Sequence, residues 1–102
     1  MRMISTGFLA GLVVGLLTGP GFAADNAEGA RLANACTSCH GLDGRSVGAA
    51  PVLAGQGEED LLVKLKAFKD GTAYATIMNR LARGYTDEEL AALAAYFASV
   101  KP

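Results

Sequence analysis

Apolar residues recur at helical spacing in two stretches of the chain, and each stretch carries its own end signals. In residues 58–70, Leu61, Leu65 and Phe68 fall on one face of a helix. Acidic side chains fill the first turn, where the helix dipole favours them, and Gly71 just past the last turn is typical of a helix end. We therefore predict a helix over residues 58–70.

The second stretch predicts a final helix that runs to about Ser99. Thr86, followed three positions later by Glu89, forms a capping box, which commonly opens a helix. The apolar side chains that follow share one face: Leu90, Leu93, Ala94 and Phe97.

The other segments are less regular. Residues 25–35 are rich in alanine, with an Asp or Asn available as N-cap, which predicts a short helix. Residues 41–57 are punctuated by glycine and by Pro51, which predicts a loop. Residues 73–83 are ambiguous and are interpreted as a short helix ending at Gly84. Because no segment has a convincing β-strand pattern, the predicted fold class is all-α.

The first two dozen residues have the pattern of a secretory signal peptide. A positive charge in residues 1–3 precedes an apolar run over residues 7–17, and small residues follow at Ala23 and Ala24. We predict a signal peptide over residues 1–23, cleaved after Ala23 or Ala24. An uncleaved membrane anchor is the alternative, although the run is shorter than the roughly 20 residues that span a bilayer.

Cleavage would leave a single domain, residues 24–102, outside the cytoplasm and, in a bacterium, in the periplasm. The whole chain has 102 residues and a formal net charge of -1, which argues against a nucleic-acid-binding protein. A domain this small has marginal stability from its apolar core alone and usually carries a disulfide or a metal. The chain contains two Cys and one His, so few residues can supply such a group.

The sequence Cys36-Thr37-Ser38-Cys39-His40 is the signature of covalent c-type haem attachment. Residues three apart on a helical turn point the same way, so both thiols can reach the two vinyl groups on one haem edge. The adjacent His40 can then offer a ring nitrogen to the iron. Three other interpretations fit less well: a redox pair lacks the usual strands, a structural disulfide would close a very short loop, and zinc lacks a fourth ligand.

Met78 is the predicted second axial ligand of the iron. Met1 and Met3 would leave with the signal peptide, so Met78 would be the only thioether of the exported protein. Histidine with methionine is a known pair of ligands in cytochromes c and raises the reduction potential. Two alternatives stay open: Met78 is a core residue, or the position is empty or filled by a Lys or by Asn79.

Pro51 is a candidate support for His40. A histidine that binds a metal usually donates its other N–H to a carbonyl or a carboxylate. A carbonyl group in residues 50–52 can accept it, and Pro51 as a simple turn former is an equally good interpretation.

On these residues the chain resembles the small class I cytochromes c, and more narrowly the haem subunit of flavocytochrome c sulfide dehydrogenase. The first block of resemblance is residues 36–56, CTSCHGLDGRSVGAAPVLAGQ, which many small bacterial cytochromes c share. The second is residues 61–99, and its segment IMNRLARGYTDEE points to the sulfide dehydrogenase group. Some members of that group have two haem domains, and this chain would match the single-haem form.

The resemblance implies a role for each site residue. Cys36 and Cys39 would form the thioether bonds, His40 and Met78 would be the axial ligands, and the Pro51 carbonyl would accept the His40 N–H. It also implies a class I fold in which the first and last helices cross around one covalent haem. At that crossing, Gly29 and Leu32 would meet Leu93 and Tyr96.

The function that this resemblance implies is one-electron transfer rather than catalysis by the chain itself. The haem subunit would accept electrons from a sulfide-oxidising flavoprotein and pass them to a soluble acceptor. A freely diffusing periplasmic carrier is the alternative, and a haem enzyme such as a peroxidase, with Met78 displaced, is a third. Lys64, Lys66 and Lys69 can form a charged docking rim, although an ordinary solvated helix surface is the simpler interpretation.

Overall fold

The computed structural model describes residues 21–102 together with Gly11. Five α-helices and two short 3₁₀ turns follow one another in this part of the chain, and no β-strand occurs within it. The all-α class predicted from the sequence is confirmed. The signal peptide predicted for residues 1–23 and its cleavage after Ala23 or Ala24 remain predictions, because residues 1–10 and 12–20 lie outside the described part.

The first helix, α1 (Gly21–Ala33), begins before the predicted residue 25. Residues 22–24 are Phe-Ala-Ala and contain no helix breaker, so the helix extends back to Gly21. It ends two residues earlier than predicted and tightens into the 3₁₀ turn η1 (Asn34–Cys36), where Asn34 disfavours a continuous α-helix. The short helix α2 (Thr37–His40) follows directly, so the motif with both cysteines sits on helical backbone.

The two helices with clear end signals occur where the sequence predicts them. The helix α3 spans Glu58–Asp70, and Gly71 closes it with a left-handed φ of 79°. The helix α5 spans Asp87–Ser99. Its capping box is complete, because the Thr86 hydroxyl accepts the Glu89 N–H at 3.1 Å and the Glu89 carboxylate accepts the Thr86 N–H at 2.9 Å.

The ambiguous segment 73–83 contains only the five-residue helix α4 (Met78–Ala82). The residues from Gly71 to Ile77 form a loop instead. The predicted loop over 41–57 is confirmed apart from one 3₁₀ turn, η2 (Leu42–Gly44).

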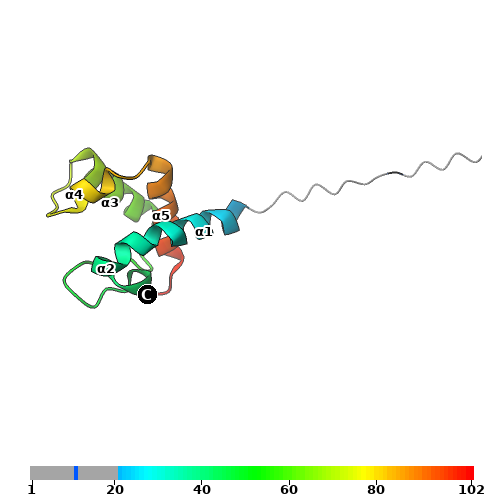
Figure 1. Cartoon of the computed structure of the whole chain (residues 1–102), viewed down its shortest axis with the longest axis horizontal. Helices are drawn as coiled ribbons and strands as arrows, with labels where there is room; N and C mark the ends of the chain where they lie inside the picture. Colours follow the sequence, from blue (N-terminus) through cyan, green and yellow to red (C-terminus); the bar gives the residue numbers. More distant parts are fainter. Residues whose placement is uncertain (1–10, 12–20) are drawn as a thin grey trace, which may run out of the picture.

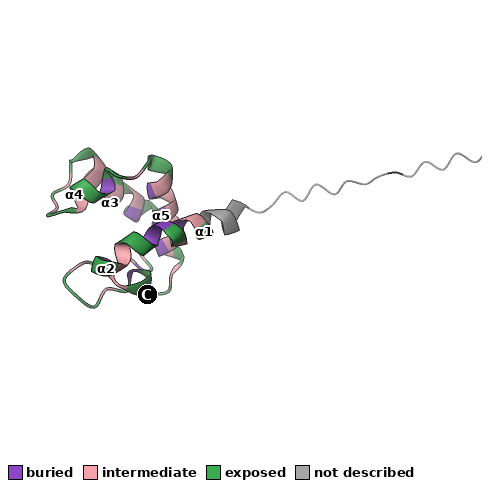
Figure 2. Cartoon of the chain, viewed as in Figure 1, coloured by how far each residue is buried: buried purple, intermediate pink, exposed green. Residues whose placement is uncertain are grey.

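The core forms where α1, α3 and α5 meet. Helix α1 crosses α5, with α3 and α4 on one side of the crossing and α2 with its loop on the other (Figure 1). Figure 2 shows buried segments gathered at this crossing. The core side chains are Leu32, Ala33, Leu61, Leu90, Leu93, Ala94 and Phe97. All four residues predicted for the inner face of α5 are among them.

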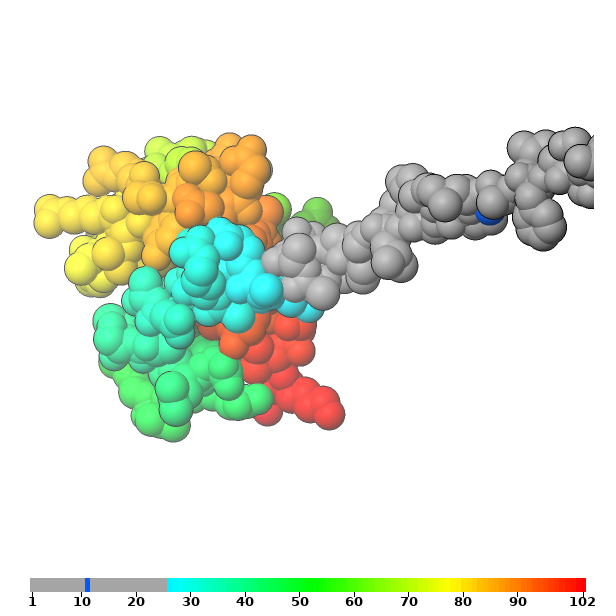
Figure 3. Space-filling model, turned by 45° about the vertical axis from the view of Figure 1, so that its right-hand side comes forward, coloured from blue at the N-terminus to red at the C-terminus, as the bar shows by residue number. Residues whose placement is uncertain are grey.

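The crossing of α1 and α5 depends on a glycine. A Cβ added at Gly29 would overlap the Ala92 carbonyl oxygen and would lie 2.6 Å from Tyr96 Cβ, so the helices meet at Gly29 because it lacks a side chain. Figure 3 shows α1 in cyan between the α4–α5 region and the loop after α2. The crossing of first and last helices that the resemblance implies is therefore present. Within residues 21–102 we find no helix with the length and hydropathy needed to cross a membrane.

Candidate haem-binding site

A cavity of about 1180 Å³ opens between the two sides of the helix crossing. One wall comes from α2 and the loop that follows it, and the other from α3, α4 and the loop that joins them. Every residue that the sequence predicts for the site lines this cavity: Cys36, Cys39, His40, Pro51 and Met78. The fold thus brings together residues that lie far apart in the chain.

The two thiols approach the cavity from consecutive helical turns. Cys36 is half-buried at the end of η1, and Cys39 is exposed in α2. Burial raises the pKa of the Cys36 thiol, and the proximity of Cys39 adds to this effect. Within the described residues, which include both cysteines of the chain, neither thiol takes part in a disulfide. Both sulfur atoms are therefore available for covalent attachment.

His40 is a buried polar side chain, 9% exposed, whose orientation is fixed by the backbone. Its ring nitrogen Nδ1 lies 2.7 Å from the carbonyl oxygen of Pro51. A carbonyl oxygen can only accept, so Nδ1 is the donor, and in the neutral imidazole Nε2 keeps its lone pair for a metal. This is the contact that the resemblance implies for Pro51.

The carbonyl of Pro51 is itself held in place by the loop around it. Gly44 O accepts the backbone N–H groups of Leu53 and Ala54, at 2.8 and 3.1 Å. The Gln56 side-chain amide donates to the carbonyl of Val52. The loop is therefore anchored directly after the residue that orients His40.

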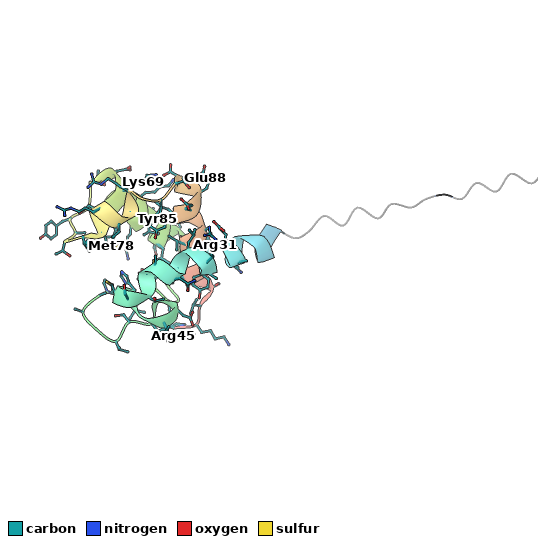
Figure 4. All side chains as sticks on the ribbon, viewed as in Figure 1. Arg31, Arg45, Lys69, Met78, Tyr85 and Glu88 are labelled. Atoms are coloured by element: carbon teal, nitrogen blue, oxygen red, sulfur yellow. The ribbon has the colours of Figure 1, made fainter. Side chains whose placement is uncertain are left out.

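Met78 reaches the cavity from the opposite wall. It is the first residue of α4 and is half-buried. In Figure 4 it lies on the side of α4 that faces α2. The cavity is thus lined by an imidazole from one wall and by a thioether from the other.

The rest of the wall is largely apolar, and its main side chains are Leu53, Leu61, Leu65, Phe68, Leu81 and Phe97. Such a lining excludes water and suits a flat, mostly apolar ring. Two thiols, one imidazole and one thioether complete the donor set of a c-type haem. In volume, lining and donors, the residues present fit this cofactor. Within residues 21–102 and Gly11, no three His, Cys, Asp or Glu side chains gather in a group suited to another metal ion.

Tyr85 is a cavity residue that the sequence analysis did not single out. It is half-buried, and burial raises the pKa of its phenol, with smaller effects of Cys36 and Glu89. Tyr85 directly precedes the cap Thr86 and packs against the core cluster that contains Leu90, which is the arrangement of a hydrophobic staple. The sequence does carry a signal for this packing, because an aromatic residue stands just before the capping box.

The three lysines of α3 have different surroundings. Lys69 Nζ pairs with Asp87 Oδ1 at 3.0 Å, and this contact lowers the pKa of Asp87. Lys64 lines the cavity and donates to Gln56 Oε1 at 3.1 Å, whereas Lys66 is simply exposed. The three therefore do not form one charged rim, and Lys64 alone borders the cavity.

Comparison with known proteins agrees with this geometry. The model of the family described as "Cytochrome c" matches residues 26–101, which include the whole cavity wall. The chain belongs to the cytochrome c family. Haem c, attached covalently, is therefore its cofactor, and with one Cys-x-x-Cys-His motif the chain is a mono-haem electron-transfer domain.

Individual relatives carry more specific names. A cytochrome c4 of Pseudomonas aeruginosa is 46% identical over an alignment of 87 residues, and the match covers 83% of this chain. The cytochrome subunit of sulfide dehydrogenase from Chlorobaculum tepidum is 38% identical over 73 residues, or 72% of this chain. A solved cytochrome c4 from Acidithiobacillus ferrooxidans superposes with a TM-score of 0.66 at 33% identity and covers 81% of this chain.

These relatives are longer than the part that matches. The chain spans 43% of the Pseudomonas cytochrome c, 66% of the Chlorobaculum subunit and 52% of the solved cytochrome c4 chain. It corresponds to one portion of each of them.

Proposed function

We propose that this cytochrome c domain holds its haem through Cys36 and Cys39, with His40 and Met78 as the axial ligands of the iron. The observation that carries the proposal is that the imidazole and the thioether, which are far apart in sequence, line one apolar cavity. When bound, the haem supplies a one-electron couple between ferrous and ferric iron.

Residues of the chain orient the proposed ligand and set the reduction potential of that couple. Pro51 accepts the His40 N–H and so fixes the ring and its tautomer, which strengthens the remaining nitrogen as a ligand. A neutral thioether sulfur from Met78 favours the ferrous state. The apolar wall opposes the extra positive charge of the ferric state, so both features raise the reduction potential.

Spectra of the purified haem protein and of a Met78→Leu variant test the ligand assignment. The wild type should have a c-type α-band and a weak near-infrared band from the iron–thioether bond. Met78→Leu should keep the α-band, because the thioether links are intact, but should lose the near-infrared band and bind carbon monoxide quickly. Val63→Leu, at an exposed site on α3, is the control. A near-infrared band that persists in Met78→Leu would rule out Met78 as ligand.

We further propose that the electron donor is a sulfide-oxidising flavoprotein and that a soluble acceptor takes the electrons. The name of the Chlorobaculum relative, cytochrome subunit of sulfide dehydrogenase, supports this proposal. Tyr74, Ile77 and Leu81 line the cavity and are 93%, 52% and 47% exposed. Where the haem leaves them uncovered, they would form an apolar surface of the kind that a stable subunit interface buries. Co-purification with a flavoprotein at moderate salt is the expected result.

A free periplasmic carrier is the second candidate function, and the charge next to the same surface favours it. Residues 71–86 contain Arg80 and Arg83 and no acidic residue. A basic rim suits brief, salt-sensitive docking to an acidic partner. If the protein purifies alone and its electron-transfer rate falls steeply with ionic strength, the carrier is correct and the subunit proposal is wrong.

Both candidates require export, which we infer from the signal pattern of residues 1–23. Expression of the full chain in a bacterium that matures c-type cytochromes should yield a periplasmic protein. Its N-terminal residue should be Ala24 or Asp25. Recovery of Met1 at the N-terminus in the membrane fraction would establish the uncleaved anchor instead.

A further inference from the structure

Asn79, the residue after Met78, links the helix that carries the thioether to the loop and the helix that precede it. Its side-chain Nδ2 donates to the carbonyl oxygen of Ala73 at 2.9 Å and to that of Phe68 at 3.2 Å. Ala73 lies in the loop that precedes α4, and Phe68 lies in the last turn of α3 and lines the cavity. One amide nitrogen therefore connects α4, the loop and α3.

The rest of this loop is anchored mainly at its start. The backbone N–H groups of Thr72 and Ala73 and the Thr72 hydroxyl all donate to the carbonyl of Ala67, at 3.0, 3.2 and 3.3 Å. Within residues 21–102, no backbone N–H from residue 74 to residue 77 donates to another backbone carbonyl. Among the hydrogen bonds of residues 21–102, those of the Asn79 side chain join α4 to Ala73 and to the end of α3.

Few residue types can make this pair of bonds. An amide NH₂ group supplies two hydrogens from one atom, and both acceptors are carbonyl oxygens. Aspartate has the same shape but would place a carboxylate against two carbonyl oxygens. Leucine has a similar size and donates nothing, so it would leave both carbonyls without this partner.

We propose that Asn79 is a positioning residue that keeps Met78 in the haem cavity. This inference rests on the proposed role of Met78 as axial ligand. Moving the thioether out of the cavity requires the α4 end of the loop to separate from α3, and the two bonds of Asn79 resist that separation. A small external ligand binds the iron only when Met78 has left, so its apparent affinity depends on the fraction of molecules in the open state.

Imidazole titration of the oxidised haem protein measures that open fraction. Loss of two hydrogen bonds should raise it about tenfold, so the imidazole dissociation constant of Asn79→Leu should be about tenfold below that of the wild type. The near-infrared band of Asn79→Leu should also disappear at a correspondingly lower imidazole concentration. Asn79→Ser, which keeps one hydroxyl donor, should fall between them and serves if the leucine variant does not take up haem.

The matched control is Thr72→Val, which removes the Thr72 hydroxyl bond to Ala67 in the same loop but leaves the tie between α4 and α3 intact. Its imidazole affinity should stay within about twofold of the wild type, even if its unfolding midpoint falls. Equal imidazole affinities for wild type, Asn79→Leu and Asn79→Ser would overturn the positioning role while leaving Met78 as ligand. A wild type without the near-infrared band would overturn the ligand assignment itself, and this inference with it.

Discussion

The imidazole of His40 donates its Nδ1–H to the carbonyl oxygen of Pro51, 2.7 Å away. The acceptor is a backbone atom, so no change of side chain at position 51 removes it. The side chain of Pro51 acts instead through the stiffness of the loop, because its ring fixes φ and limits the unfolded chain. The orientation of the His40 ring and the stability of the loop can therefore be separated by mutation.

Pro51→Ala should lower the free energy of unfolding by about 0.4–1 kcal/mol, because the unfolded chain gains conformational freedom. The α-band and the near-infrared band should be unchanged, since the carbonyl stays in place. Denaturant unfolding together with an absorption spectrum checks both expectations. A variant that loses the near-infrared band at full occupancy with haem would mean that the proline ring itself sets the ligand geometry.

Gly29→Ala should destabilise the protein by about 1–3 kcal/mol, because an added methyl group would overlap the Ala92 carbonyl oxygen and crowd Tyr96. The gain in helix propensity, about 1 kcal/mol, offsets only part of that cost. Thermal unfolding of the haem protein measures the difference. Gly48→Ala is the matched control: no atom lies within 4 Å of its added Cβ, and its stability should change by less than about 0.5 kcal/mol. Equal effects at the two positions would contradict the close approach of α1 and α5.

Thr86→Ala should cost about 1 kcal/mol of unfolding free energy, because the Glu89 N–H loses its acceptor at the start of α5. Glu89→Ala breaks the reciprocal bond to the Thr86 N–H. The double variant should cost less than the sum of the two single changes, since the bonds support each other. Glu88→Gln, in the same turn but outside the box, controls for charge and should change stability by about half a kcal/mol or less. Strict additivity would show that the two bonds act independently.

The contrast between α5 and α4 explains which parts of the fold the sequence could predict. Thr86 and Glu89 mark one helix start, and Gly71 marks another helix end, because capping chemistry is local. Met78 has no comparable cap before it, since Ile77 makes no side-chain bond to the helix start. Asn79 bonds to Phe68 and Ala73, which lie eleven and six residues earlier, so local patterns could not give the extent of the loop before α4.

The same distinction holds for the haem site. The thiols and His40 are adjacent in sequence, so the motif alone predicts their role. The position of Met78 opposite His40 follows from the crossing of α1 and α5 and from the packing of α3, which no local pattern encodes. Met78 can be chosen by elimination only because the chain contains three methionines, two of which lie in the predicted signal peptide.

Tyr96→Phe should remove one contribution to the fall in unfolding free energy at alkaline pH. The Tyr96 hydroxyl donates to Asp43 Oδ1 at 2.7 Å, and this bond, followed by burial, raises the pKa of Tyr96. A group whose pKa is higher in the folded state contributes stability that is complete below its unfolded pKa, about 10 for tyrosine, and is lost as the pH rises through the folded pKa. The wild type should therefore exceed Tyr96→Phe by about 0.5–1 kcal/mol at pH 7, a modest value because the pair is solvent-accessible.

That difference should shrink as the pH rises above about 10, as followed by denaturant unfolding across pH 7 to 11. Other groups also titrate in this range, but they are common to both proteins and cancel in the comparison. Tyr74→Phe is the control, because the Tyr74 ring is 93% exposed and its change should leave stability unaffected at every pH. A constant difference between wild type and Tyr96→Phe from pH 7 to 11 would mean that the hydroxyl contributes by packing, whereas a shrinking one identifies the bond to Asp43 as the pH-dependent link between α5 and the loop after the haem motif.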